Sequence, residues 1–208
     1  FNQVGAGVFS MSTTALPNSN GIGGPWAFFG NGANMKYAVN NAGTIGGLTG
    51  TAAADAEAFT SATTNYDFST TGTTTLTTDR TANTIRYTGT GNTIDLGASG
   101  ANTLTLNGIL ATGASGTLTL DRTGGTGTVV IGASNELVIA GQQAVTINAP
   151  ISNNSGALTY SGTNTLTLGG NNTFRGGVNI SNGTVLLANA GALNSAATFE
   201  NAVNFGAS

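Results

Sequence analysis

The chain has 208 residues, of which 39% are hydrophobic and only 6% charged, with a formal net charge of −3 and neither Cys nor His. These values exclude disulfides, metal sites built from Cys or His, and catalysis by either residue. Five basic residues are too few for the basic stripe that nucleic acid requires, and no apolar run reaches the length of about 18 residues that spans a membrane. We therefore expect no nucleic-acid partner, no membrane insertion by this segment, no metal and no cofactor.

Residues 1–68 differ in composition from residues 69–208, because they hold nine of the fourteen aromatic residues. The first segment is predicted to be an N-terminal capping or interface segment, and the second to be a region of repeated strands. Aromatic residues near either end of the chain suit a contact that covers an open sheet edge. The predicted assembly interface comprises Trp26, Phe28, Phe29, Tyr37, Phe199 and Phe205. A local hydrophobic plug and a platform for stacking sugars are the alternatives for the N-terminal aromatic residues.

Residues 52–59 read AAADAEAF, which combines good helix formers with early acidic residues. This pattern favours one or two helical turns that cap a coil. An Ala-rich loop is the alternative.

From residue 69 onward, short runs of Thr, Val, Ile and Leu alternate with a period of two residues, as in NTLTL (102–106) and GTLTL (116–120). Such alternation is typical of strands with one aliphatic face and one Thr face. Gly and Asn separate the runs and suit tight corners. SGANTLTLNG (99–108) and SGTNTLTLGG (161–170) resemble each other, which indicates coils of about 20 residues and roughly nine coils in the chain.

A β-sandwich is the main alternative to a β-solenoid, because Asn-Gly pairs such as 107–108 and 182–183 are typical of hairpins. The runs are only three to five residues long, however, and small polar residues recur beside the turns. Both features favour stacked coils with side-chain hydrogen-bond ladders.

Residues 157–193 read ALTYSGTNTLTLGGNNTFRGGVNISNGTVLLANAGAL. This stretch resembles the passenger-associated transport repeat, also called the autotransporter-associated β-strand repeat. The residues that carry the resemblance include Gly162, Leu166, Leu168, Asn172, Phe174, Val178, Ile180, Gly183 and Gly191-Ala192-Leu193. Arg175 and Val185 depart mildly from the pattern. The resemblance implies a right-handed parallel β-helix within an exported bacterial surface protein, and a role in passenger folding and transport rather than in catalysis.

Eight acidic residues are spread over the chain with no two adjacent. Stacked coils could still bring distant acids together, for instance Asp95 and Asp121, and glycosidase chemistry needs two carboxyls within roughly 5–9.5 Å. Solvated corner acids are the simpler interpretation. A single Asp within residues 89–97 is a poor start for calcium, which takes about 6–8 oxygen ligands. We expect no catalytic residue, and the chain is predicted not to be an enzyme.

The sequence thus predicts a structural module: a secreted β-solenoid at the bacterial cell surface that forms a fibre or filament by stacking end to end on copies of itself or on adjacent repeats. The absence of Cys and His and the scarcity of Lys and Arg suit a durable extracellular material. An adhesin passenger that binds glycans or surfaces is the alternative. A β-helical polysaccharide-degrading enzyme is a remote one.

Overall fold

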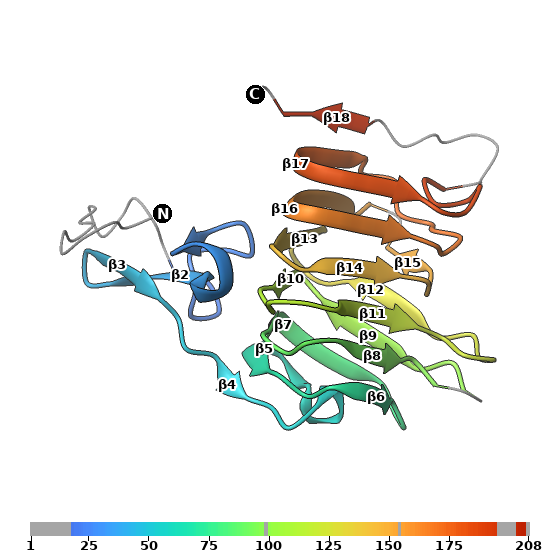
Figure 1. Ribbon diagram of the computed structural model, residues 1–208, viewed down its shortest axis with the longest axis horizontal. Helices are drawn as coiled ribbons and strands as arrows, with labels where there is room; N and C mark the ends of the chain where they lie inside the picture. The colour runs from blue at the N-terminus through green and yellow to red at the C-terminus, as the bar shows by residue number, and fades with distance from the viewer. Residues whose placement is uncertain (1–17, 98–99, 154, 195–202, 207–208) are drawn as a thin grey trace.

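The computed structural model describes residues 18–97, 100–153, 155–194 and 203–206. Within these ranges the chain consists of β-strands, two short 3-10 turns and connecting segments. The predicted β-solenoid is confirmed, because most strands belong to one sheet of parallel pairs that winds into about six stacked turns (Figure 1).

Three faces make up each turn of the solenoid. The first face runs along the whole stack and contains β4 (Thr51–Ala52), β5 (Thr60–Phe68), β7 (Arg80–Tyr87), β10 (Gly108–Ala111), β13 (Glu136–Gly141), β16 (Ala157–Leu168), β17 (Val178–Leu187) and β18 (Val203–Phe205). The second face contains β6 (Gly72–Thr75), β8 (Asn92–Asp95), β11 (Thr117–Asp121), β14 (Ala144–Ile147) and the C-terminal halves of β16 and β17. The third contains the start of β7, then β9 (Thr103–Leu106), β12 (Thr128–Ile131) and β15 (Ile151–Ser152).

The solenoid interior is built from residues that stack on their counterparts in neighbouring turns. In the first face the strand register places one interior position in a single column, formed by Tyr66, Ile85, Ile109, Ile139, Tyr160, Ile180 and Phe205. Its five members from Tyr66 to Tyr160 are buried. Each buried side chain therefore packs between a residue above it and a residue below it.

The alternation seen in the sequence sets which side chains enter this interior. In β11, Leu118 and Leu120 are fully buried, whereas Thr117 and Thr119 face outward. The corner before the strand needs glycine, because Gly116 has a φ of +76° and a Cβ there would collide with the carbonyl oxygen of Thr90. Alternating side chains and glycine corners together produce the flat faces and sharp bends of the coil.

The turns vary in length more than the sequence repeats suggest. Register partners in the first face lie 19 residues apart from Tyr66 to Ile85 and 30 residues apart from Ile109 to Ile139. The expectation of roughly nine coils is wrong, and the structure has about six turns. Longer corners and an N-terminal segment outside the solenoid account for the difference.

That N-terminal segment forms a small antiparallel sheet of β1 (Phe28–Phe29), β2 (Lys36–Asn41) and β3 (Thr44–Gly47), with the 3-10 turn η1 (Gly32–Asn34). It lies beside the solenoid, as the blue part of Figure 1 shows. Ile22 and Tyr37 pack on Leu110 and Ala140, which point outward from the first face. This sheet and the preceding residues 18–27, here together called the lateral unit, therefore cover one flank of the stack.

The parallel sheet begins before residue 69, because β4 pairs with β5 and β5 pairs with β7. The expected boundary after residue 68 thus falls within the solenoid. Phe59, Tyr66 and Phe68 are interior residues of its first turns, with ring centroids 5.2 Å apart for Phe59 and Tyr66 and 5.3 Å apart for Phe59 and Phe68. These three aromatic residues therefore belong to the solenoid, whereas Phe28, Phe29 and Tyr37 belong to the sheet beside it.

We predict that Ile109→Ala lowers the free energy of unfolding by about 2–5 kcal/mol, because it leaves a cavity in the column between Ile85 and Ile139. Thr119→Ala, on the outward side of β11, is the matched control and should change it by less than about 0.5 kcal/mol. Urea denaturation followed by circular dichroism measures both. Equal effects of the two substitutions would contradict the assignment of the interior.

Candidate functional site

The C-terminal end of the solenoid exposes residues that are buried everywhere else in the stack. Tyr160 is buried, Ile180 in the next turn is half-buried, and Phe205 at the end of the same column is 77% exposed. In the second face, Leu168 is fully buried while its register partner Leu187 is 47% exposed. The interior of the last turns is therefore open to solvent.

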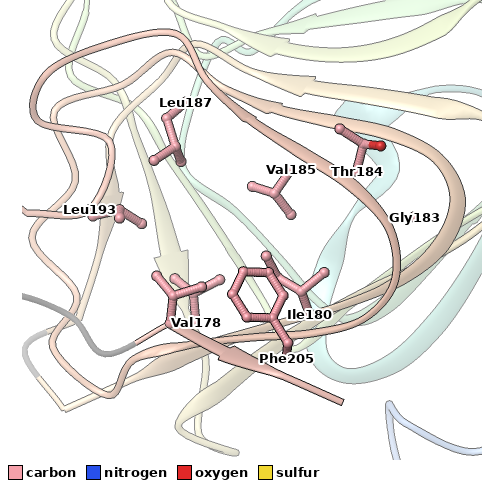
Figure 2. Close-up of a pocket in the computed structure, with 9 residues that line it drawn as sticks. Val178, Ile180, Gly183, Thr184, Val185, Leu187, Leu193 and Phe205 are labelled. Atoms are coloured by element: carbon pink, nitrogen blue, oxygen red, sulfur yellow. The ribbon is translucent and has the colours of Figure 1, made fainter. Parts of the chain in front are cut away.

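These residues surround an apolar hollow of about 470 Å³. Figure 2 shows the side chains of Val185 and Leu187 on one side of it and those of Ile180 and Phe205 on the other. Its lining consists of Val178, Ile180, Gly183, Thr184, Val185, Leu187, Leu193, Val203 and Phe205. No charged side chain belongs to this lining, so the hollow is suited to apolar groups.

Open backbone edges border the hollow. Among the described strands, β18 pairs only with β17, and the second-face half of β17 pairs only with β16. Unpaired edges of this kind accept a further strand through backbone hydrogen bonds. The C-terminal end thus offers both an apolar interior and the strand edges that a further turn requires.

The N-terminal end of the solenoid is closed in a different way. The residues predicted as helix form a single 3-10 turn, η2 (Ala56–Ala58), whose N-cap Asp55 accepts a hydrogen bond from the Glu57 amide at 2.9 Å. Ala56 and Phe59 are fully buried against the first turns. In the described part of the chain, exposed large apolar side chains occur at the C-terminal end and at Trp26, and none at this cap.

The Glu57 carboxylate links the cap, residues 53–59, to the first turns of the solenoid. Glu57 accepts hydrogen bonds from the Thr77 amide at 2.7 Å and the Thr77 hydroxyl at 2.8 Å, and it pairs with Arg80. Partial burial raises the pKa of the Glu57 carboxyl, but these hydrogen bonds and the Arg80 charge together outweigh burial and hold the pKa below its ordinary value of 4.5. The ionised form of Glu57 is the one that the cap stabilises.

The predicted interface residues are not gathered in one place. Trp26, Phe28, Phe29 and Tyr37 belong to the lateral unit rather than to an end of the stack. Tyr37 is buried and donates a hydrogen bond to the Ile85 carbonyl at 3.4 Å, and burial raises the pKa of its hydroxyl well above the ordinary value. Phe205 does lie at the C-terminal end, whereas Phe199 is outside the described residues.

Stacking does bring Asp95 and Asp121 together, because they are register partners in adjacent turns. Each carboxylate accepts a hydrogen bond from the backbone of a corner: Asp95 accepts one from the Thr123 amide at 3.0 Å, and Asp121 accepts one from the Arg122 amide at 2.8 Å. Across the described ranges, no group of three or more His, Cys, Asp or Glu residues is placed to hold a metal ion. The two acids are thus explained by the hydrogen bonds of the corners.

Sequence reasoning identified Phe205 but missed the hollow beside it. In the run TVLL, Val185 and Leu187 alternate with Thr184 and Leu186. The period-two pattern marks Val185 and Leu187 as interior positions, and no strand run follows directly to cover them. The cap was indicated only in part, since the sequence showed Asp55 and Glu57 but not their partners.

No protein-family model, curated protein or solved structure matches the chain. The resemblance of residues 157–193 to the passenger-associated repeat therefore stays a prediction that rests on those residues alone. None of the described helical turns is long and apolar enough to cross a membrane.

We predict that Glu57→Gln increases hydrogen exchange of the Phe59 and Thr77 amides at pH 7, because it weakens the contacts that hold the cap. Since the folded state lowers the pKa of Glu57, the stabilisation is present above about pH 4.5 and is lost as the pH falls through the lowered pKa. The difference between wild type and variant should therefore shrink toward pH 3. Glu136→Gln, in β13, is the control and should leave these two amides unchanged. A difference that persists at pH 3 would contradict the role of the charge.

Proposed function

We propose that this chain is a structural β-solenoid module of an extracellular, cell-surface protein, and that it builds a fibre by receiving a further coil at its C-terminal end. The observation that carries the proposal is the apolar hollow with its unpaired strand edges. Fully burying a large apolar side chain contributes about 1.5–3 kcal/mol, and Leu187 and Phe205 offer an arriving coil the share of that gain that corresponds to their exposed surface.

The chemistry of the hollow defines what fits it. The arriving segment needs apolar side chains in register with Leu187 and Phe205, and a backbone free to pair with β17 and β18. A coil of the same kind as those in this chain meets both requirements, from an adjacent repeat or from a neighbouring copy. For assembly between copies, β4 and β6 supply the free backbone edges, because each pairs on one side only within the described structure. The hollow would then close over the small residues of the cap, which exposes no large apolar side chain.

The two ends also give such a fibre a direction. The cap at residues 53–59 buries the interior at the N-terminal end, while the C-terminal end leaves it open. Contacts that repeat from unlike ends do not close on themselves and generate filaments. The low charge and the lack of Cys and His support an extracellular setting in which neither redox state nor histidine titration affects the fibre.

The test is assembly of the purified chain, followed by light scattering at increasing concentration and by negative-stain microscopy. We expect rods longer than one copy for the wild type. Leu187→Asp should weaken assembly at least about tenfold, because it places a charge in the hollow.

Leu186→Asp is the matched control, since Leu186 is the adjacent exposed leucine and is not part of the hollow. It should assemble as the wild type does. Circular dichroism shows whether each variant keeps its β-structure. Single short rods at every concentration, pairs that never lengthen, or equal assembly of the two variants would each overturn the proposal.

A further inference from the structure

A second hollow lies on the flank of the solenoid, away from both ends. It measures about 330 Å³ and is bounded on one side by residues 19–25 of the lateral unit. The other side is formed by corners of four successive turns, at residues 62–63, 82–83, 105–107 and 132–134. This lateral groove therefore runs along the stack and suits an extended ligand.

Asparagine side chains fix the shape of the lateral groove. Asn83 donates to Asn65 Oδ1 at 2.8 Å, and Asn107 donates to Asn83 Oδ1 at 3.0 Å. The Oδ1 atom of Asn107 accepts the Ser134 amide at 3.0 Å, and Asn20 joins the lateral unit to the ladder through Asn83 at 3.3 Å. Because each rung bonds the next, the groove is held in one shape without a ligand.

Other polar groups of the lateral groove stay available. Thr105 and Asn20 line the groove, and the Thr105 hydroxyl and the Asn20 Oδ1 atom form no hydrogen bond with another described residue. Gly132, Ala82 and Ala133 contribute small apolar groups to the lining. No charged side chain lines the groove, so its chemistry favours a neutral ligand with hydroxyl groups.

The indole of Trp26 does not itself line this groove, but it lies against Gly24, which does. Its side chain folds over Gly24, where a Cβ would lie 2.7 Å from the indole Nε1 atom, and Gly24 and Pro25 both line the groove. Trp26 is nevertheless 57% exposed, and the described residues include few other exposed large apolar side chains. An aromatic face beside neutral hydrogen-bonding groups suits a sugar ring, whose C–H face packs on the indole.

We propose that the lateral groove binds a short stretch of a neutral oligosaccharide, with one sugar ring on Trp26 and Pro25 and sugar hydroxyls on Thr105 and Asn20. Its volume is at the small end of ligand pockets, which span about 300–1,000 Å³, so it accommodates only a few sugar rings. This site is independent of the hollow at the C-terminal end.

The single tryptophan makes the test specific, because Trp26 is the only indole that can report binding. Intrinsic fluorescence is titrated with a panel of neutral hexasaccharides of glucose, mannose, xylose and N-acetylglucosamine, and with an anionic galacturonate hexamer. We expect at least one neutral sugar to change the Trp26 emission saturably, and the anionic hexamer to bind more weakly.

Calorimetry with the best sugar then compares variants. Trp26→Ala should weaken binding at least about tenfold, and Thr105→Val at least threefold. Phe205→Ala, at the C-terminal end, is the control and should bind as the wild type does, so that failure of this site and failure of end-to-end assembly are separate results. Binding by no neutral sugar of the panel, preference for the anionic hexamer, or saturable binding that survives Trp26→Ala would overturn the proposal.

Discussion

The structure depends on one constraint: each interior side chain must lie between its counterparts in the turns above and below. The column from Tyr66 to Phe205 shows the consequence, because the same position is buried at Tyr160 and exposed at Phe205. A parallel stack satisfies its own backbone and interior everywhere except in its first and last turns. Apart from Trp26, the exposed large apolar side chains of the described residues are therefore concentrated in the last turns.

The two ends meet this constraint by opposite means. At the N-terminal end, Phe59 closes the interior, and Glu57 ties the closing turn to Thr77 and Arg80. At the C-terminal end, the described residues include no such turn, and aliphatic side chains line a hollow. The cap uses one short segment and a buried aromatic ring, whereas the described C-terminal end leaves Leu187 and Phe205 exposed.

The sequence predicted the interior well because alternation is a local property: Leu118 and Leu120 face inward and Thr117 faces outward, as the run GTLTL indicates. Turn length could not be read in this way, since the connections between strands differ in length and leave no periodic pattern: register partners lie 19 residues apart from Tyr66 to Ile85 but 30 apart from Ile109 to Ile139. The docking of the lateral unit had one overlooked indication. Residues 108–111 read GILA, and such an uninterrupted apolar run is typical of a strand covered on both sides, as Leu110 is by Tyr37.

Residues on the flank and residues at the ends of this solenoid are thus under different packing constraints. A residue at an end is constrained by the register of the column below it, so Leu187 must resemble Leu168 if a further turn is to pack there. A residue on the flank, such as Trp26 or Thr105, is constrained only by its neighbours at the surface. Its identity does not have to match that of a residue in the next turn. Asn20 joins the lateral unit to Asn83, and the asparagine ladder links Asn83 to Asn65, Asn107 and Ser134 in the other turns, so the flank carries a groove of fixed shape away from the ends. The lengthening that we propose at one end and the binding that we propose at the flank therefore use no residue in common.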